Sequence, residues 1–216
     1  MRKLSIMAAI RQRLHVAPED QTRQRAIVSR MTRHRANTRP AIGVLDGIAR
    51  LEQFVHSATR KGAIVSQVND IAAAATTILK VLPVGSHICL TSAATETGIK
   101  LPVDLIEPWN PKTSVDNSLS TCFCGIAESG SLVVRSDTGN SLSLNFLSDR
   151  HFVLIPERDI LDSMESVWAK VREQGGMPRD LTFVSGPSST GDIEMRMETG
   201  AHGPRELHIL MLAGDL

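Results

Sequence analysis

Aromatic residues are scarce in this chain of 216 residues, and tyrosine is absent. Aromatic residues make up 3% of the sequence, whereas hydrophobic residues together make up 42%. The predicted core must therefore consist of Ile, Val, Leu, Ala and Met side chains, which are numerous enough to exclude wholesale disorder. The same scarcity argues against single-stranded nucleic acid as a ligand, because such ligands are bound by stacking their bases on aromatic rings.

Long apolar segments and disulfide patterns are also missing. No run approaches the ~18 consecutive apolar residues that a membrane-spanning helix requires. The N-terminus is basic and apolar, but arginines return too soon for a secretory signal peptide. The three cysteines Cys89, Cys122 and Cys124 lack the spacing of a disulfide framework, which is typical of a reducing compartment. We therefore expect a cytoplasmic protein with no membrane partner.

Metal and nucleotide fingerprints are weak or absent. The spacing of Cys122 and Cys124 predicts both thiols on one face of a strand. A four-cysteine iron–sulfur cluster needs one more cysteine than the chain has, and a zinc site that adds a histidine would lack the usual C-x₂₋₄-C spacing. We favour buried, unreactive cysteines and predict no metal site. The common glycine-rich dinucleotide and ATP motifs do not occur either.

The net charge of +1 conceals a strong asymmetry. Residues 1–40 contain ten Lys and Arg against Glu19 and Asp20, a balance of +8, and the remainder carries −7. Apolar residues at helical spacing predict two helices here, the second opening after Pro18. We predict a basic helical N-terminal arm, residues 1–42, that docks on an acidic surface of the body or of a partner, or simply presents a solvated face. Nucleic acid is not expected, because the arm lacks aromatics and a DNA-binding motif.

From residue 43 onward, short apolar runs alternate with helical patterns. This alternation is typical of a parallel sheet covered by helices on both faces, so we predict an α/β domain over residues 43–216. Helices are predicted over 46–60, 71–82 and 162–171, the second capped by Asp70 and the third opened by a capping box of Asp162 and Glu165. Strands are predicted over 63–68, 87–90, 103–106, 120–127, 131–134, 151–156, 181–184 and 207–212.

The stretch from Leu181 to Pro204 is the most informative. Its apolar run 181–184 predicts a buried strand, and the next residues, 185–192, hold two glycines, four hydroxyls and a carboxylate. Glycine permits close approach to a ligand, and successive backbone N–H groups in such a turn suit an anion. The alternation over 193–198 predicts a half-exposed strand, and a turn then presents His202. The alternative interpretation is a tight loop and hairpin whose hydroxyls bond to their own backbone.

Two segments carry a resemblance to a known family. The segment SGPSSTGDIE, followed by GAHGP and LHILML, resembles the C-terminal signature of the lactate-utilisation protein C family (LutC), whose members contain the LUD domain. GIAESG, at 125–130, resembles that family's G-I-A-E-[ST]-G segment, although Gly191 stands where the family pattern has alanine. The resemblance implies a Rossmann-like, mostly parallel fold with helices on both faces, like that of ribose-phosphate isomerase and CoA-transferases.

The same resemblance implies a function. It suggests an accessory subunit of bacterial L-lactate oxidation that acts beside iron–sulfur partner proteins and has no cofactor of its own. Two other classes stay open: a stand-alone enzyme of the CoA-transferase or isomerase kind acting on an acyl or sugar-phosphate substrate, and a regulatory module that works through the arm. Whether this chain is itself catalytic stays open as well.

We predict that the two motifs meet at one ligand site. In open α/β sheets ligands bind beyond the carboxyl ends of the strands, and both motifs follow predicted strands. Glu128 is the candidate general base, nucleophile or ribose ligand, and His202 is the candidate proton donor or acceptor. The predicted residues for binding a small anion are Gly186, Ser188, Ser189, Thr190, Asp192 and Glu194.

Each of these roles has a structural alternative. Glu128 can simply occupy a turn between two strands, and His202 can be a structural residue of a hairpin. Asp192 can bond to its own loop. His208 alternates within a strand and is predicted to be a packing residue.

Overall fold

The computed structural model describes residues 2–17, 19–33, 43–110, 115–136, 142–191, 197–200 and 202–214. The chain divides into two compact units, Met1–Thr38 and Arg39–Leu216. Two of the predicted ligand residues, Asp192 and Glu194, lie outside the described residues. The segment 34–42, where the arm is predicted to end, lies outside them too.

The first unit contains the two predicted helices, α1 (Arg2–Arg13) and α2 (Gln21–Arg33). The Asp20 carboxylate accepts the backbone N–H of Arg23 (3.0 Å), as expected of an N-terminal cap. No described residue of α2 is buried. The helices of this arm therefore gain little from packing within the unit.

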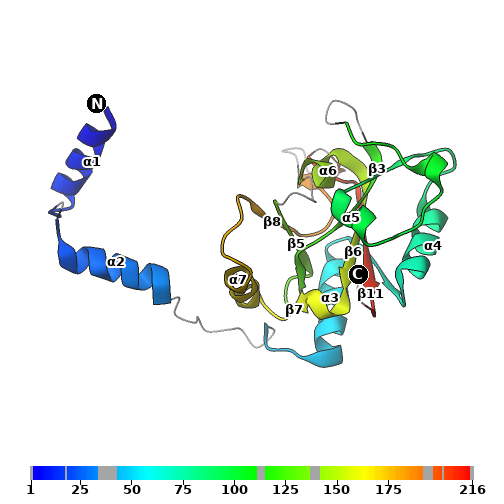
Figure 1. Cartoon of the computed structure of the whole chain (residues 1–216), viewed down its shortest axis with the longest axis horizontal. Coiled ribbons are helices and arrows are strands. Elements are labelled where there is room, and N and C mark those ends of the chain that lie inside the picture. Colours follow the sequence, from blue (N-terminus) through cyan, green and yellow to red (C-terminus); the bar gives the residue numbers. More distant parts are fainter. Residues whose placement is uncertain are drawn as a thin grey trace. The chain divides into compact units, whose positions relative to one another are not determined.

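The second unit is built on a five-stranded sheet in the order β1-β11-β6-β3-β2, in which every pairing is parallel. Its strands are β1 (Ile64–Val68), β2 (Ile88–Leu90), β3 (Val115–Thr121), β6 (Ser148–Pro156) and β11 (Glu206–Leu212). Strand β11 lies between β1 and β6, and Figure 1 shows it in red beside β6. The parallel sheet confirms the predicted α/β class.

Helices cover both faces of this sheet because successive strand residues point to opposite sides. Leu154 of β6 packs in a cluster with α4 (Ile71–Val81), whereas its neighbour Val153 packs in a second cluster with α3 (Gly47–Arg60). The predicted cap is confirmed, since Asp70 accepts the backbone N–H of Ala73 (2.7 Å). Two shorter helices are α5 (Ser92–Glu96) and α6 (Leu142–Leu147).

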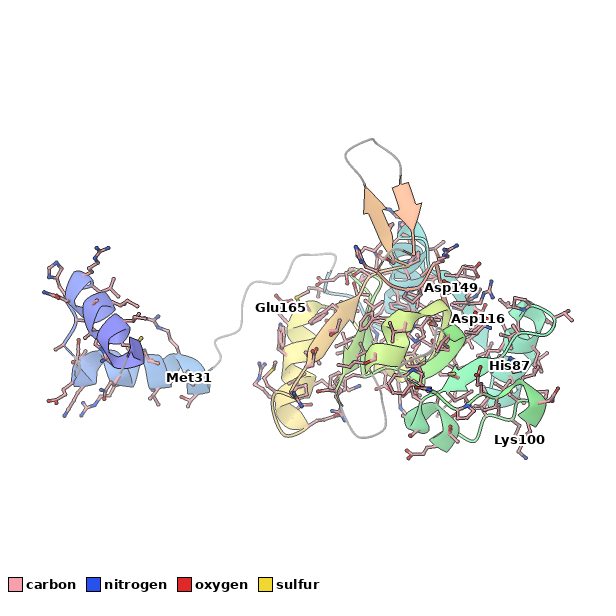
Figure 2. All side chains as sticks on the ribbon, turned by 90° about the horizontal axis from the view of Figure 1, so that it is seen from above. Met31, His87, Lys100, Asp116, Asp149 and Glu165 are labelled. Atoms are coloured by element: carbon pink, nitrogen blue, oxygen red, sulfur yellow. The ribbon has the colours of Figure 1, made fainter. Side chains whose placement is uncertain are left out.

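A second, four-stranded sheet in the order β7-β4-β5-β8 was not predicted. Its strands are β4 (Cys124–Ile126), β5 (Ser131–Arg135), β7 (Ile160–Leu161) and β8 (Leu181–Val184). Strand β5 runs antiparallel to β4 and β8, so β4, β7 and β8 share a direction. Helix α7 (Met164–Glu173) packs on this sheet through Val167 and Val171. Figure 2 shows β9 (Ser189–Gly191) and β10 (Met197–Thr199), in orange, projecting as a hairpin.

Two predicted elements are wrong in detail. Residues 103–106 form no strand: Val103–Leu105 is a 3₁₀ turn (η2), and only an isolated bridge joins Ile106 to β2. Val103 is 85% exposed, so this run has no core to enter. The predicted capping box is also displaced, because Ser163 is the N-cap of α7. Asp162 instead accepts the Ser163 backbone N–H (2.7 Å). A further 3₁₀ turn, η3 (Glu157–Asp159), precedes β7.

The predicted strand over 120–127 is divided between the two sheets, and this separates the two cysteines. Cys122 packs against the cluster that contains α3, whereas Cys124 belongs to the cluster beneath α7, so the same-face prediction is wrong. Burial raises the pKa of the Cys124 thiol to about 12 and raises the pKa of Cys122 well above its usual range. Both thiols are therefore protonated at neutral pH, which disfavours thiolate chemistry.

The described helices also bear on the membrane question. None of them combines the length and the apolar character that crossing a bilayer requires.

Candidate functional site

The two predicted motifs, GIAESG at 125–130 and the segment that begins at Ser185, lie side by side in the four-stranded sheet, where β5 begins and β8 ends. Leu132 of β5 pairs with Val184 of β8, so the residue before one and the residue after the other are neighbours. The hydroxyls of Ser131 and Ser185 are hydrogen-bonded at 2.5 Å, and Ser129 donates to Ser131 at 2.9 Å. Three hydrogen-bonded hydroxyls thus connect the turn that carries Glu128, the glutamate-bearing turn, to residues 185–191, which we call the serine-rich elbow.

Glycines of both motifs lie against the last turns of α3. Gly130 has a φ of +64°, and a Cβ atom there would collide with the backbone of Ala58. Gly186 has a φ of +90°, and a Cβ atom there would collide with the carbonyl oxygen of Lys61. Glycine is required at both positions, because the backbone is left-handed and another backbone lies in contact. These two glycines therefore pack the motifs against α3.

The carboxylate of Glu128 is held at the N-terminus of α7. Its Oε1 accepts the backbone N–H of Met164 at 3.0 Å, and its own N–H donates to the carbonyl of Asp162 at 3.1 Å. On the other side, a Cβ added to Gly43 would lie 2.6 Å from Oε2. The positive end of the helix dipole favours a negative charge at this position. Glu128 is half-buried and ties the motif to α7 and to the segment before α3.

The elbow uses much of its polar capacity internally. The backbone N–H of Ser188 donates to the carbonyl of Pro204 at 2.8 Å, and its carbonyl accepts the N–H of Gly200 at 3.0 Å. Its hydroxyl accepts the backbone N–H of His202 at 3.3 Å. Ser189 continues into the hairpin, where it pairs with Thr199. This geometry agrees with the alternative interpretation of a tight loop and hairpin for Ser188, while it brings Ser188 and His202 together.

The elbow also has a defined position in the parallel sheet. It follows the carboxyl end of β8, as predicted, but in the five-stranded sheet it lies at the amino ends of the strands. A Cβ on Gly62, just before β1, would lie 3.3 Å from Pro187. Pro204 precedes β11, and the N–H of Arg205 donates to the carbonyl of Asp149 in β6 at 2.7 Å. Three parallel strands therefore begin beside the elbow.

A partly buried ion-pair network supports the start of β11. Arg150 binds Glu206 through two hydrogen bonds, of 2.6 and 3.0 Å, and also donates to Asn117 at 3.0 Å. Hydrogen bonds from Arg150 and then from His208 lower the pKa of Glu206 to about 2. His208 is buried 4.9 Å from the ring of Phe152, which confirms its predicted packing role. In the sequence, only the i, i+2 spacing of Glu206 and His208 indicates that both side chains lie on the same face of a strand.

Several polar side chains near the elbow stay exposed. His202, Ser189 and Lys61 are exposed, and so is Arg205, which forms a loose ion pair with Asp149 at 3.6 Å. Cationic and hydroxyl groups thus face solvent next to the elbow, which is a favourable setting for an anion. The other predicted residue, Thr190, lies in β9 and pairs with Glu198 through the backbone.

Comparison with known proteins places this geometry in a family. The LUD domain matches residues 51–212, which include both motifs. Lactate utilization protein C of Deinococcus radiodurans is 35% identical over 103 residues, which are 45% of this chain and 46% of that protein. An uncharacterised protein of Neisseria meningitidis is 33% identical over 113 residues, which are 51% of this chain and 48% of that protein. The chain therefore spans about half the length of these relatives.

A solved structure supports the fold. The crystal structure of a DUF162 family protein from Deinococcus radiodurans superimposes with a TM-score of 0.60, at 21% identity, and covers 79% of this chain and 100% of its own. At that identity the likeness concerns the fold alone. Because the LUD domain extends over well more than half of the sequence, the chain belongs to the LUD domain family.

Proposed function

We propose that this chain is a LutC-like accessory subunit of a system that oxidises L-lactate to pyruvate. The observation that carries the proposal is the LUD domain match together with the 35% identity to a lactate utilization protein C. In this proposal electrons pass to iron–sulfur clusters on partner subunits. The cysteine count supports that division, because a four-cysteine cluster needs one more thiolate than the three cysteines of this chain provide.

Within this role, we assign the elbow to a small anionic ligand such as a carboxylate. Ser188, Ser189 and His202 would contact the anion, whereas Thr190, Asp192 and Glu194 stay sequence-based candidates for the same site. Gly186 contributes by letting the elbow pack on α3. The exposed Arg205 and Lys61 supply positive charge beside it.

A stand-alone transferase or isomerase is less well supported. Such an enzyme would need Glu128 free to attack an acyl group or to abstract a proton. The carboxylate instead accepts the Met164 N–H, and the backbone at Gly43 lies against its other oxygen. These contacts favour a positioning role, in which Glu128 holds α7 against the motif.

Growth on L-lactate tests the proposed function. A strain without this chain should fail to grow on L-lactate as sole carbon source, should grow on pyruvate, and should recover when the chain is restored. Normal growth of the deleted strain on L-lactate would remove the basis of the proposal.

Ligand binding tests the assignment of the elbow separately. Calorimetric titration of the full chain with L-lactate and with pyruvate should detect binding that His202→Ala and Arg205→Ala each weaken by about tenfold. Arg172→Ala, on an exposed position of α7, is the matched control and should leave affinity unchanged. Binding that survives both elbow substitutions would place the anion elsewhere.

A further inference from the structure

The arm exposes more apolar surface than a stable pair of helices would keep in water. Seven large apolar side chains of α1, α2 and the turn between them are at least 43% exposed. They are Ile6, Met7, Ile10, Leu14, Ile27, Val28 and Met31. Met31, labelled in Figure 2, is 68% exposed. Isolated helices of 12 and 13 residues are marginal in water, so these two need a packing partner.

Four of these seven apolar side chains line a groove. Met7 and Ile10 of α1, Leu14 just after it and Ile27 of α2 line a hollow of about 240 Å³. Arg11 and Arg23 lie on its lining as well. Small-molecule pockets are usually larger, at roughly 300–1,000 Å³. The size suits one or two aliphatic side chains inserted by another polypeptide.

The charge of the arm indicates which kind of polypeptide would bind in the groove. The arm carries +8 over residues 1–40, and its basic side chains accompany both helices. A second copy of the arm would add like charge to like charge, which opposes pairing of two arms. An acidic partner would neutralise the arginines while it covers the apolar groove.

We propose that the helical part of the arm, residues 2–33, is a docking element for an acidic amphipathic helix of another protein. Apolar side chains of that helix would enter the groove, and its carboxylates would pair with arginines at the rim, as in other helix-in-groove complexes. The arm lacks the Trp and Phe residues that anchor interfacial membrane helices, which argues against a lipid surface. The inference does not depend on the proposed role in lactate oxidation.

Fluorescence anisotropy with a defined probe tests this docking surface. The full chain is titrated into a labelled helical peptide of Leu, Glu and Ala whose leucines recur at i, i+3, i+4 and i+7. A second peptide has the same composition with the leucines scattered around the helix. The amphipathic peptide should bind at least about tenfold more tightly than the scattered one, and high salt should weaken binding.

Two double variants separate the apolar and the charged contributions. Ile10→Ala/Leu14→Ala and Arg11→Gln/Arg23→Gln should each weaken binding of the amphipathic peptide by about tenfold. Both keep good helix formers, and circular dichroism checks that the helical content is retained. Arg172→Gln/Arg179→Gln, at exposed positions of the second unit, should leave binding unchanged.

Four outcomes overturn the proposal. They are absence of binding, equal binding of both peptides, tighter binding to a DNA duplex, and tighter binding to vesicles of phosphatidylglycerol and phosphatidylcholine. Equal binding would reduce the arm to a non-specific polycation. The last two outcomes would assign it to nucleic acid or to a membrane surface.

Discussion

The side-chain oxygens of Ser131 and Ser185 lie 2.5 Å apart and join segments separated by 54 residues in the sequence. Ser131 is 3% exposed, whereas Ser185 is exposed. Their hydrogen bond closes the edge where β5 and β8 pair, and it fixes the elbow relative to the glutamate-bearing turn. The geometry of the proposed ligand site therefore depends on a contact that involves none of the proposed ligand residues.

This hydrogen bond should be measurable as a coupling between the two serines. Ser131→Ala should lower the free energy of unfolding by about 1 kcal/mol, because it leaves the hydroxyls of Ser129 and Ser185 without this partner. Combined with Ser185→Ala in a double-mutant cycle under urea, the pair should show a coupling energy of about 0.5–1.5 kcal/mol. Ser143→Ala, at an exposed position of α6, is the control. Additive effects of the two serine substitutions would mean that they do not interact.

Because Gly130 packs on α3, substitution of Gly130 should cost more stability than substitution of Gly175. Gly130→Ala combines a left-handed residue with a collision against the Ala58 backbone, and should cost roughly 2–5 kcal/mol in unfolding free energy. Gly175 also has a positive φ, of +97°, but nothing lies within 4 Å of an added Cβ. Gly175→Ala should therefore cost only about 1–2 kcal/mol. Equal losses in chemical denaturation would show that Gly130 is not a packing position.

Glu128 should behave as a tie to α7 rather than as a nucleophile. Glu128→Gln keeps an oxygen for the Met164 N–H and loses only the charge at the helix N-terminus, which is worth about 0.3–1 kcal/mol. Glu128→Ala should cost about 0.5–2 kcal/mol, as loss of a cap does. Lactate-dependent growth should be retained with Glu128→Gln. Loss of growth with a fully stable Glu128→Gln protein would restore a catalytic role.

Because His151 is buried, we expect the free energy of unfolding to fall as the pH is lowered below neutrality. His151 is 1% exposed, its Nε2 is bonded to Ser120 at 2.8 Å, and burial lowers its pKa from 6.5 to about 3. The folded state keeps the ring neutral while the unfolded chain takes up a proton. This contribution is therefore complete above pH 6.5 and is lost as the pH falls toward 3. His208, whose pKa burial also lowers, acts in the same direction.

Between pH 6.5 and 5 the change in unfolding free energy can be assigned to the buried histidines. Glu206, with a pKa lowered from 4.5 to about 2, loses its contribution only below that window. His151→Gln should reduce the slope of unfolding free energy against pH by about 1 kcal/mol per unit, close to one proton. His87→Gln, at an exposed position labelled in Figure 2, should leave the slope unchanged. An unaltered slope in His151→Gln would show that the ring is protonated in the folded protein.

Sequence patterns correctly predicted those helices and strands whose limits are set by neighbouring residues in the chain. The acidic cap before α4 was predicted because Asp70 precedes an uninterrupted helical pattern, and the observed hydrogen bond is local. Strand β1 followed from an apolar run bounded by a glycine. The run 103–106 failed because short apolar runs do not distinguish a strand from a turn. Pro102 precedes it, and the side chain of Val103 faces solvent.

The two motifs of the candidate site could be recognised in the sequence, but their contacts could not. The glycine and serine motifs were visible in the sequence, whereas their contacts join distant positions: Gly130 with Ala58, and Ser188 with Pro204. The division of one apolar run into β3 and β4 removed the expected single sheet. No periodicity reports such a division, because it depends on how the chain turns after residue 121.

Reconstitution of lactate oxidation from purified components is the most direct test of the proposed function. Purified iron–sulfur partner subunits are combined with this chain, and the L-lactate-dependent reduction of an artificial electron acceptor is followed. We expect activity only when the chain is present, none from the chain alone, and strongly reduced activity with His202→Ala. Full activity without this chain would show that the iron–sulfur partners oxidise L-lactate without it.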